Sequence, residues 1–391
     1  MRRVYMDHAA GMPVDSRVFE AMKPFCRENY GNPSSPHSYG AIARNALAEA
    51  RERVAQLVGA EKPEEVIFTS GGTESNNLAI KGVAHRNRDK GNHIITTTIE
   101  HISVINICKH LQKQGFKVTQ VPADKEGLVD PEKLKDEITD KTILVSIMYA
   151  NGEIGTIQPI REIGKIAHDN KVAFHVDAVA AAGKVPTNVE EENIDLLSIS
   201  SNDMYGPKGM GALYIKKGTR IQPILQGGGQ ERGLRSGTEN VPGMVGMGTA
   251  AEIAQKEMES EGTRLTAIRD KLIKGVLDTI TSSYLNGHPT KRLPGNANLR
   301  FSYIEGESLI LGLDMLGIQV SSGSACTSKT LEPSHVLLAI GLAHEEAHGS
   351  LVFTMGKQNS EEDVNYVLES LPGVVKRLRE ISPLTPKEML R

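Results

Sequence analysis

The chain has 391 residues, 39% of them hydrophobic and 24% charged, which is typical of a soluble globular protein with room for one large and one smaller domain. A formal net charge of −3, no tryptophan and only 4% aromatic residues argue against nucleic-acid or membrane-surface binding. No apolar run approaches the roughly 18 residues that a membrane span needs, and the N-terminus lacks a signal-peptide core. The three cysteines are widely spaced and odd in number, which favours a reducing cytoplasm over a disulfide framework.

In the N-terminal third, the sequence predicts two helices and then a turn that could bind an anion. Asp15 is expected to cap a helix with an apolar face, and a second helix is predicted over residues 39–58. A strand over 65–70, the glycines 71 and 72 and a helix over 75–85 follow. Free N–H groups and the helix dipole at such a turn favour a phosphate, although most turns of this kind are plain connections.

Further strands alternate with helices through residue 215. This alternation predicts an α/β fold with a mostly parallel sheet and helices on both faces. Open sheets of this type bind ligands at the carboxyl ends of their strands. An aspartate at a strand end is often only a cap, and a histidine there can be a core residue. The candidate ligand-binding residues at these ends are Gly72, Thr73, His101, Asn151, Asp177 and Ser200.

The composition changes after a glycine-rich polar loop at residues 226–240. One or two long helices are predicted over 242–280, which suits a helix that bridges to a second domain. Strands over 297–303 and 318–320 and a helix over 361–380 indicate a smaller α+β unit. We therefore expect a large ligand-binding domain at residues 15–255 and a small domain made of 256–391 together with 1–14.

The most informative stretch runs from residue 198 to 215 and reads strand, polar break, strand, with Gly206-Pro207-Lys208-Gly209 in the break. Here, and over essentially the whole chain, the sequence resembles the NifS/IscS-type cysteine desulfurases, which depend on pyridoxal 5'-phosphate (PLP) and are related to class-V aminotransferases. The resemblance implies a fold-type I homodimer that acts on L-cysteine or another sulfur source and passes sulfur to an IscU-type iron–sulfur scaffold protein.

The resemblance also implies a role for each polar strand-end residue. Asp177 would pair with the PLP ring nitrogen and keep it protonated, so that the ring acts as an electron sink. His101 would stack on the ring and take part in catalysis, and Asn151 would bond the phenolic oxygen. The phosphate would be held by Gly72, Thr73, Ser200 and Asn202, the last in place of a family histidine, and by Thr238 of the partner subunit.

Departures from the family gather in the same site. Asp203 replaces the lysine that holds PLP as a Schiff base, so any bound PLP is expected to be non-covalent, and Lys208 is the nearest alternative amine. Val352 replaces the arginine that grips the substrate carboxylate, and Ala180 replaces a cofactor-contacting glutamine. A lost general acid/base costs about 10² to 10⁴ in rate. An ionised Asp203 would also repel the substrate carboxylate by roughly 4 kcal/mol at about 4 Å.

A small, polar loop at residues 321–334 surrounds Cys326. Its composition indicates an exposed loop, whereas an inert buried thiol would have apolar neighbours, as Cys108 does. The resemblance makes Cys326 the catalytic thiol that attacks the substrate sulfur and carries it as a persulfide. A second hypothesis is that Cys326 ligates a [2Fe-2S] cluster shared with the scaffold protein, because thiolates are iron–sulfur ligands.

Three interpretations follow. The first is a cysteine desulfurase with an altered mechanism and weak or lost cysteine-to-alanine activity, and the second is a non-catalytic PLP-binding dimer that presents Cys326 for cluster assembly. The third, another fold-type I enzyme such as an aminotransferase or lyase, is disfavoured by the cysteine loop. The sequence alone leaves the first two open.

Overall fold

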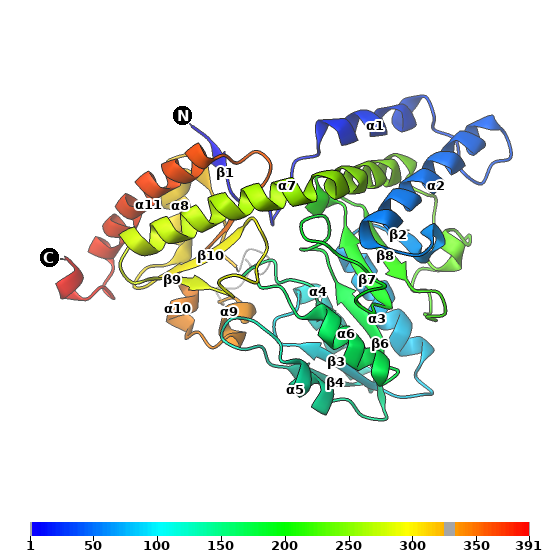
Figure 1. The fold of residues 1–391 in the computed structure, drawn as a ribbon, viewed down its shortest axis with the longest axis horizontal. Coiled ribbons are helices and arrows are strands. Elements are labelled where there is room, and N and C mark those ends of the chain that lie inside the picture. The colour runs from blue at the N-terminus through cyan, green and yellow to red at the C-terminus, as the bar shows by residue number, and fades with distance from the viewer. Residues whose placement is uncertain (1, 324–332, 391) are drawn as a thin grey trace.

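The computed structural model describes residues 2–323 and 333–390 (Figure 1). Cys326 lies outside the described residues, so its predicted roles stay predictions. The centre is a seven-stranded sheet in which β8 alone runs antiparallel to its neighbours, which confirms the predicted mostly parallel sheet. Its strands, in spatial order, are β2 (Val66–Thr69), β8 (Gly211–Ile215), β7 (Leu196–Ser200), β6 (Ala173–Asp177), β5 (Thr142–Met148), β3 (His93–Thr97) and β4 (Lys117–Val121).

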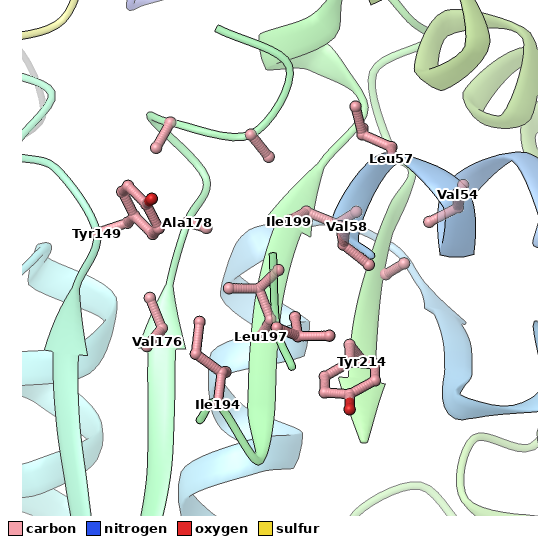
Figure 2. Packing of buried hydrophobic residues seen from close by; sticks show 14 of the residues in the cluster. Val54, Leu57, Val58, Tyr149, Val176, Ala178, Ile194, Leu197, Ile199 and Tyr214 are labelled. Carbon is pink, nitrogen blue, oxygen red and sulfur yellow. The ribbon is translucent and has the colours of Figure 1, made fainter. Parts of the chain in front are cut away.

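Helices cover both faces of the sheet, because alternate strand residues are apolar on both sides. In β2, Phe68 belongs to one core cluster and its neighbour Ile67 to the other. The first face packs against α2 (Ser38–Val58), α6 (Ile160–Asp169) and the start of α7, and Figure 2 shows Val58 of α2 beside Ile199 of β7. The second face packs against α3 (Gly72–Arg86) and α4 (Ile102–Lys113).

The predicted bridge is one continuous helix, α7 (Val241–Thr279). Asn240 caps its start, because the Asn240 Oδ1 accepts a bond from the Gly243 N–H. Its first half packs against α1 (Ser16–Arg27) and α2, and Gly248 permits close approach because a side chain there would meet the backbone of Ala50. Its second half joins a separate apolar core. Figure 1 shows this helix running along the molecule from α1 and α2 to α11.

The second core brings the two ends of the chain together. Val4 and Met6 pack with residues 268–375, and β1 (Val4–Tyr5) pairs in parallel with β11 (Ile318–Gln319). A three-stranded antiparallel sheet lies here, in the order β12 (Ser350–Thr354), β10 (Asn296–Phe301), β9 (Ser283–Asn286). We propose the domain division expected from the sequence, 15–255 and 256–391 with 1–14. The remaining helices are α5 (Pro131–Asp136), α8 (Gly306–Asp314), α9 (His335–Ala339), α10 (His344–His348) and α11 (Glu361–Ile381).

The start of α3 differs from the prediction. The helix predicted over 75–85 begins at Gly72, so Gly72 and Thr73 belong to its first turn rather than to the break before it. The Glu74 carboxylate accepts a bond from the Ser70 N–H at 2.7 Å, which helps to start the helix early.

Across residues 2–323 and 333–390, no helix combines the length and apolarity that crossing a membrane would require.

Candidate active site

A cavity of about 460 Å³ opens where the carboxyl ends of the parallel strands meet residues of the second core. Two predicted residues are not in its wall. The Asn202 side chain instead accepts a bond from the Met12 N–H at 3.4 Å, and Thr238 is exposed on the loop at 226–240, so its predicted role needs a second subunit. The predicted residues that do line the cavity are Gly72, Thr73, His101, Asn151, Asp177, Ser200, Asp203 and Val352.

The start of α3 provides N–H groups at one end of the cavity. Gly71 begins the helix at φ 145°, without a side-chain cap, which leaves N–H groups of the first turn for an anion. Gly72 is held close to Val179, and a side chain at position 72 would overlap it. Together with the Ser200 hydroxyl, which also lines the cavity, this is the donor set that a phosphate requires.

Asp177, at the end of β6, is buried at the cavity wall with 5% of its surface exposed. Its carboxylate accepts bonds from Asn76 Nδ2 at 2.7 Å and from the Val179 N–H at 3.1 Å. Burial raises the pKa of Asp177, while the nearby His101 favours the ionised form. A protonated ring nitrogen would supply the buried carboxylate with the full positive charge that its present partners lack.

Asn76 and Ser103 link Asp177 to His101, and sequence reasoning missed both. Asn76 Nδ2 also donates to Ser103 Oγ at 3.1 Å, and that hydroxyl bonds His101 Nδ1 at 2.8 Å. The signal in the sequence was Asn76 itself, an amide one turn after Gly72 on a face of α3 that is otherwise apolar. Its Oδ1 is buried and has no partner among the described residues, so the wall has an acceptor to offer a ligand.

Asn151 is already held by the chain. Its Oδ1 accepts bonds from the N–H groups of Glu153 and Ile154, both at 2.9 Å, and its Nδ2 donates to the Ile99 carbonyl at 2.9 Å. Among the described residues, the other amide hydrogen meets only the Met148 sulfur at 3.4 Å. A bond from Asn151 to a ligand oxygen would therefore use this second hydrogen.

Asp203 faces a lysine that the sequence gave no reason to select. Lys184 Nζ lies 3.6 Å from Asp203 Oδ1, and both side chains line the cavity. Lys208, the alternative amine, is not in the cavity wall and donates to the Met12 carbonyl at 2.9 Å. Asp203 is therefore not the isolated anion considered from the sequence, because the Lys184 ammonium offsets its charge.

Two further carboxyl groups lie in the wall: Glu100 is fully buried, and Glu153 is partly exposed as a residue but has a buried Oε1. Burial raises the pKa of Glu100 to about 8 and that of Glu153 to about 7. Glu100 accepts bonds from Thr97 Oγ1 at 2.7 Å and the Met148 N–H at 3.0 Å, and Glu153 accepts one from Ser334 Oγ at 2.7 Å. Each keeps one oxygen without a partner among the described residues.

The residues of the cavity fit the phosphate, the ring nitrogen and the ring substituents of PLP. They offer N–H groups for a phosphate, a buried carboxylate for the ring nitrogen, and Asn76 Oδ1 and the second Asn151 amide hydrogen for ring substituents. At position 203 the side chain is a carboxylate, which cannot condense with an aldehyde.

Comparison with known proteins adds an independent result. The family model for class-V aminotransferases matches residues 4–367. The chain is 58% identical to cysteine desulfurase IscS 1 of Archaeoglobus fulgidus over 97% of this chain and 99% of that protein. It is 56% identical to cysteine desulfurase IscS of Methanosarcina thermophila over 99% of this chain and 95% of that protein.

Solved structures give the same fold. A NifS-like protein superposes with a TM-score of 0.91 at 41% identity, covering 96% of this chain and 100% of that one. A structure described as SspA in complex with cysteine superposes with a TM-score of 0.81 at 36% identity, covering 90% and 98%. These matches confirm the predicted fold-type I architecture, whose class-V members are PLP-dependent.

Proposed function

Because the chain belongs to the class-V aminotransferase family, and within it to the NifS/IscS-type cysteine desulfurases, we propose that it handles sulfur for iron–sulfur cluster assembly through Cys326, with weak or no cysteine-to-alanine activity of its own. One observation supports the expectation of weak or no cysteine-to-alanine activity. The cavity keeps groups suited to the phosphate and ring nitrogen of PLP, yet position 203 is a carboxylate and position 352 a valine.

PLP, when bound, supplies the electron sink of the reaction. In the proposed arrangement Gly72, Thr73 and Ser200 hold its phosphate, and Asp177 keeps a proton on its ring nitrogen. His101 orients the ring and moves protons, since its Nδ1 is fixed by Ser103 and its other nitrogen remains available. Apolar residues such as Val352, Leu293 and Met355 exclude water from the same cavity.

Cysteine-to-alanine activity is expected to be weak for two reasons, and both lower the rate. No lysine at position 203 is present to accept and return a proton, a role that typically contributes about 10² to 10⁴ in rate. No arginine at position 352 is present for bidentate recognition of a carboxylate. L-cysteine still suits the cavity as a ligand, in line with the related SspA, whose solved complex contains cysteine.

We further propose that the protein works as a homodimer in a reducing cytoplasm, where Cys326 stays a free thiol. Support for the dimer comes from apolar side chains left exposed on and near α1 and α2, including Phe19, Tyr30, Tyr39 and Ile42. Thr238 is exposed, as a residue that reaches a partner's phosphate must be in the isolated subunit. An IscU-type scaffold is the proposed sulfur acceptor, and the described ends of the Cys326 loop, Gly323 and Ser334, line the cavity.

The proposal is tested on purified protein incubated with PLP. Borohydride reduction followed by mass spectrometry should find no pyridoxyl group on any side chain, dialysis should remove the PLP, and alanine should form from L-cysteine only slowly. After incubation with a polysulfide, whose S–S bond a thiolate can cleave, persulfide labelling followed by mass spectrometry should mark Cys326 in the wild type. The Cys326→Ala variant should lose that label, whatever the exposed Cys26 retains. A covalent pyridoxyl group, or rapid alanine formation, would contradict the untethered, weakly active protein proposed here.

The alternative function, a cluster ligand at Cys326, is favoured by the intact cysteine loop beside the altered PLP site. The described residues include no group of three or more histidine, cysteine or acidic side chains able to hold a metal. In this alternative the scaffold supplies the other ligands. A complex reconstituted with an IscU-type scaffold should show the visible absorbance of a [2Fe-2S] cluster that Cys326→Ala destabilises and Cys26→Ala leaves unchanged. A cluster indifferent to Cys326→Ala would exclude this function.

A further inference from the structure

The cavity retains a cation that the loss of the arginine at position 352 would not suggest. We propose that Lys184 binds the carboxylate of the amino-acid ligand, and that Asp203 competes with that carboxylate for the Lys184 ammonium. This inference deepens the proposed function and rests on it, because it requires an amino acid in the cavity. The evidence is the set of charged residues in the wall, the bonding of each, and their position relative to Val352.

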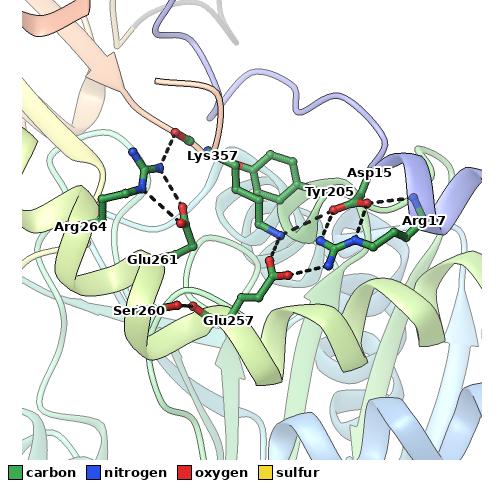
Figure 3. Close-up of polar contacts among 9 residues, drawn as sticks. Asp15, Arg17, Tyr205, Glu257, Ser260, Glu261, Arg264 and Lys357 are labelled. Carbon is green, nitrogen blue, oxygen red and sulfur yellow. Dashed lines mark hydrogen bonds and ion pairs between the residues drawn. The ribbon is translucent and has the colours of Figure 1, made fainter. Parts of the chain in front are cut away.

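Among the described residues of the wall, two lysines carry the positive charge, and one of them is already neutralised. Lys357 Nζ lies 2.5 Å from Glu257 and 3.7 Å from Asp15, and 5.1 Å from the centre of the Tyr205 ring. Arg17 bonds the same two carboxylates, so the four charges form a closed network (Figure 3). Lys357 is therefore a structural cation that holds α1 and α7 together.

Lys184 is bonded much less completely. Its only ion pair among the described residues is with Asp203 at 3.6 Å, which is longer than a hydrogen bond between an ammonium and a carboxylate. Its side chain is 24% exposed and that of Asp203 11%, so the pair is at the cavity surface rather than in a sealed core. An ammonium with three donors and one loose partner can take a second carboxylate.

The position of Lys184 matches the side of the cavity from which the arginine is missing. Lys184 and His8 both line the cavity, and the Lys184 charge adds to burial in lowering the pKa of His8, whose Nδ1 bonds the Thr354 carbonyl at 3.0 Å. Thr354 follows Val352 by two residues in β12, so both side chains lie on the same face of the strand, and both residues line the cavity. A carboxylate placed over Val352 would thus approach the His8 and Lys184 side of the wall.

The test compares two ligands that differ only in the carboxylate, L-alanine and L-alaninamide, by calorimetric titration of the PLP-incubated dimer. Neither has a thiol that could react with PLP. Lys184→Met keeps the length and apolar stem of the side chain and is expected to weaken L-alanine binding about 10- to 100-fold, as for one charge-assisted hydrogen bond, without changing L-alaninamide binding. Lys184→Arg should restore L-alanine binding, and Asp203→Asn should strengthen it by removing the competitor.

Each outcome decides the proposal. The control Lys208→Met, outside the wall, should change neither ligand. Equal loss of both ligands in Lys184→Met, or no loss of either, would overturn the role of Lys184 while leaving the amino-acid site in place. Absence of L-alanine binding by the wild type would instead overturn the proposed substrate cavity and this inference with it. A pyridoxyl group found on Lys184 after borohydride reduction would overturn both the carboxylate role and the untethered cofactor.

Discussion

Asp203→Lys is expected to give the protein a covalently held cofactor and to raise alanine formation from L-cysteine by roughly 10² to 10⁴ over the wild type. The reason is that the change places an amine at position 203, while Asp177, Asn76 and the start of α3 already offer partners for the rest of PLP. The neighbouring Lys184 helps, because a second ammonium nearby lowers the pKa of an amine and favours the nucleophilic free base.

Two measurements check this expectation. Mass spectrometry after borohydride reduction should place a pyridoxyl group at position 203, and amino-acid analysis should follow alanine release. Asp203→Asn is the matched control, since it removes the carboxylate without adding an amine and so measures the relief of charge repulsion alone. Equal rates in the two variants, or an adduct elsewhere, would show that the residue at position 203 does not limit the reaction.

The sequence was sufficient to predict the sheet and the place of the site. The alternation of short apolar runs with helical segments indicated parallel strands, and polar residues at successive strand ends meet in one cavity because those ends share an edge. The α7 helix was predicted in position, but whether it was one helix or two was left open. Only the three-dimensional structure, in which Gly248 lies against Ala50, shows how its first half packs without a break.

The remaining parts of the site depend on contacts that cross long sequence separations. Lys184 and Asp203 follow the ends of the neighbouring strands β6 and β7, and neither local sequence predicts that their side chains form an ion pair. Ser103 was given no role from the sequence, yet its hydroxyl connects His101 to Asn76, the partner of Asp177. Asn202 was assigned by resemblance alone, and the structure shows its amide bonded to the N-terminal segment, a contact that no local pattern encodes.

The second large effect concerns stability and comes from the Glu153 carboxyl group, whose Oε1 is buried. Its pKa is about 7 in the folded protein against 4.5 in the unfolded chain, so between these pH values the folded state holds a proton that the unfolded state has lost. Unfolding free energy must therefore fall as pH rises through this window, by about 3 kcal/mol for this group, and change no further above it. Glu153→Gln keeps an acceptor for Ser334 and removes the titrating group, so this part of the pH dependence should disappear.

Urea denaturation at pH 5 and pH 8 measures the difference directly. The wild type should lose about 3 kcal/mol more than Glu153→Gln between the two pH values, and the variant should be the more stable protein at pH 8. Glu132→Gln, on the exposed side of α5, serves as the control and should leave the pH dependence of the wild type unchanged. If Glu153→Gln and the wild type lose stability in parallel, the Glu153 carboxyl has access to solvent or to a compensating cation near Ser334, and its burial does not set its protonation.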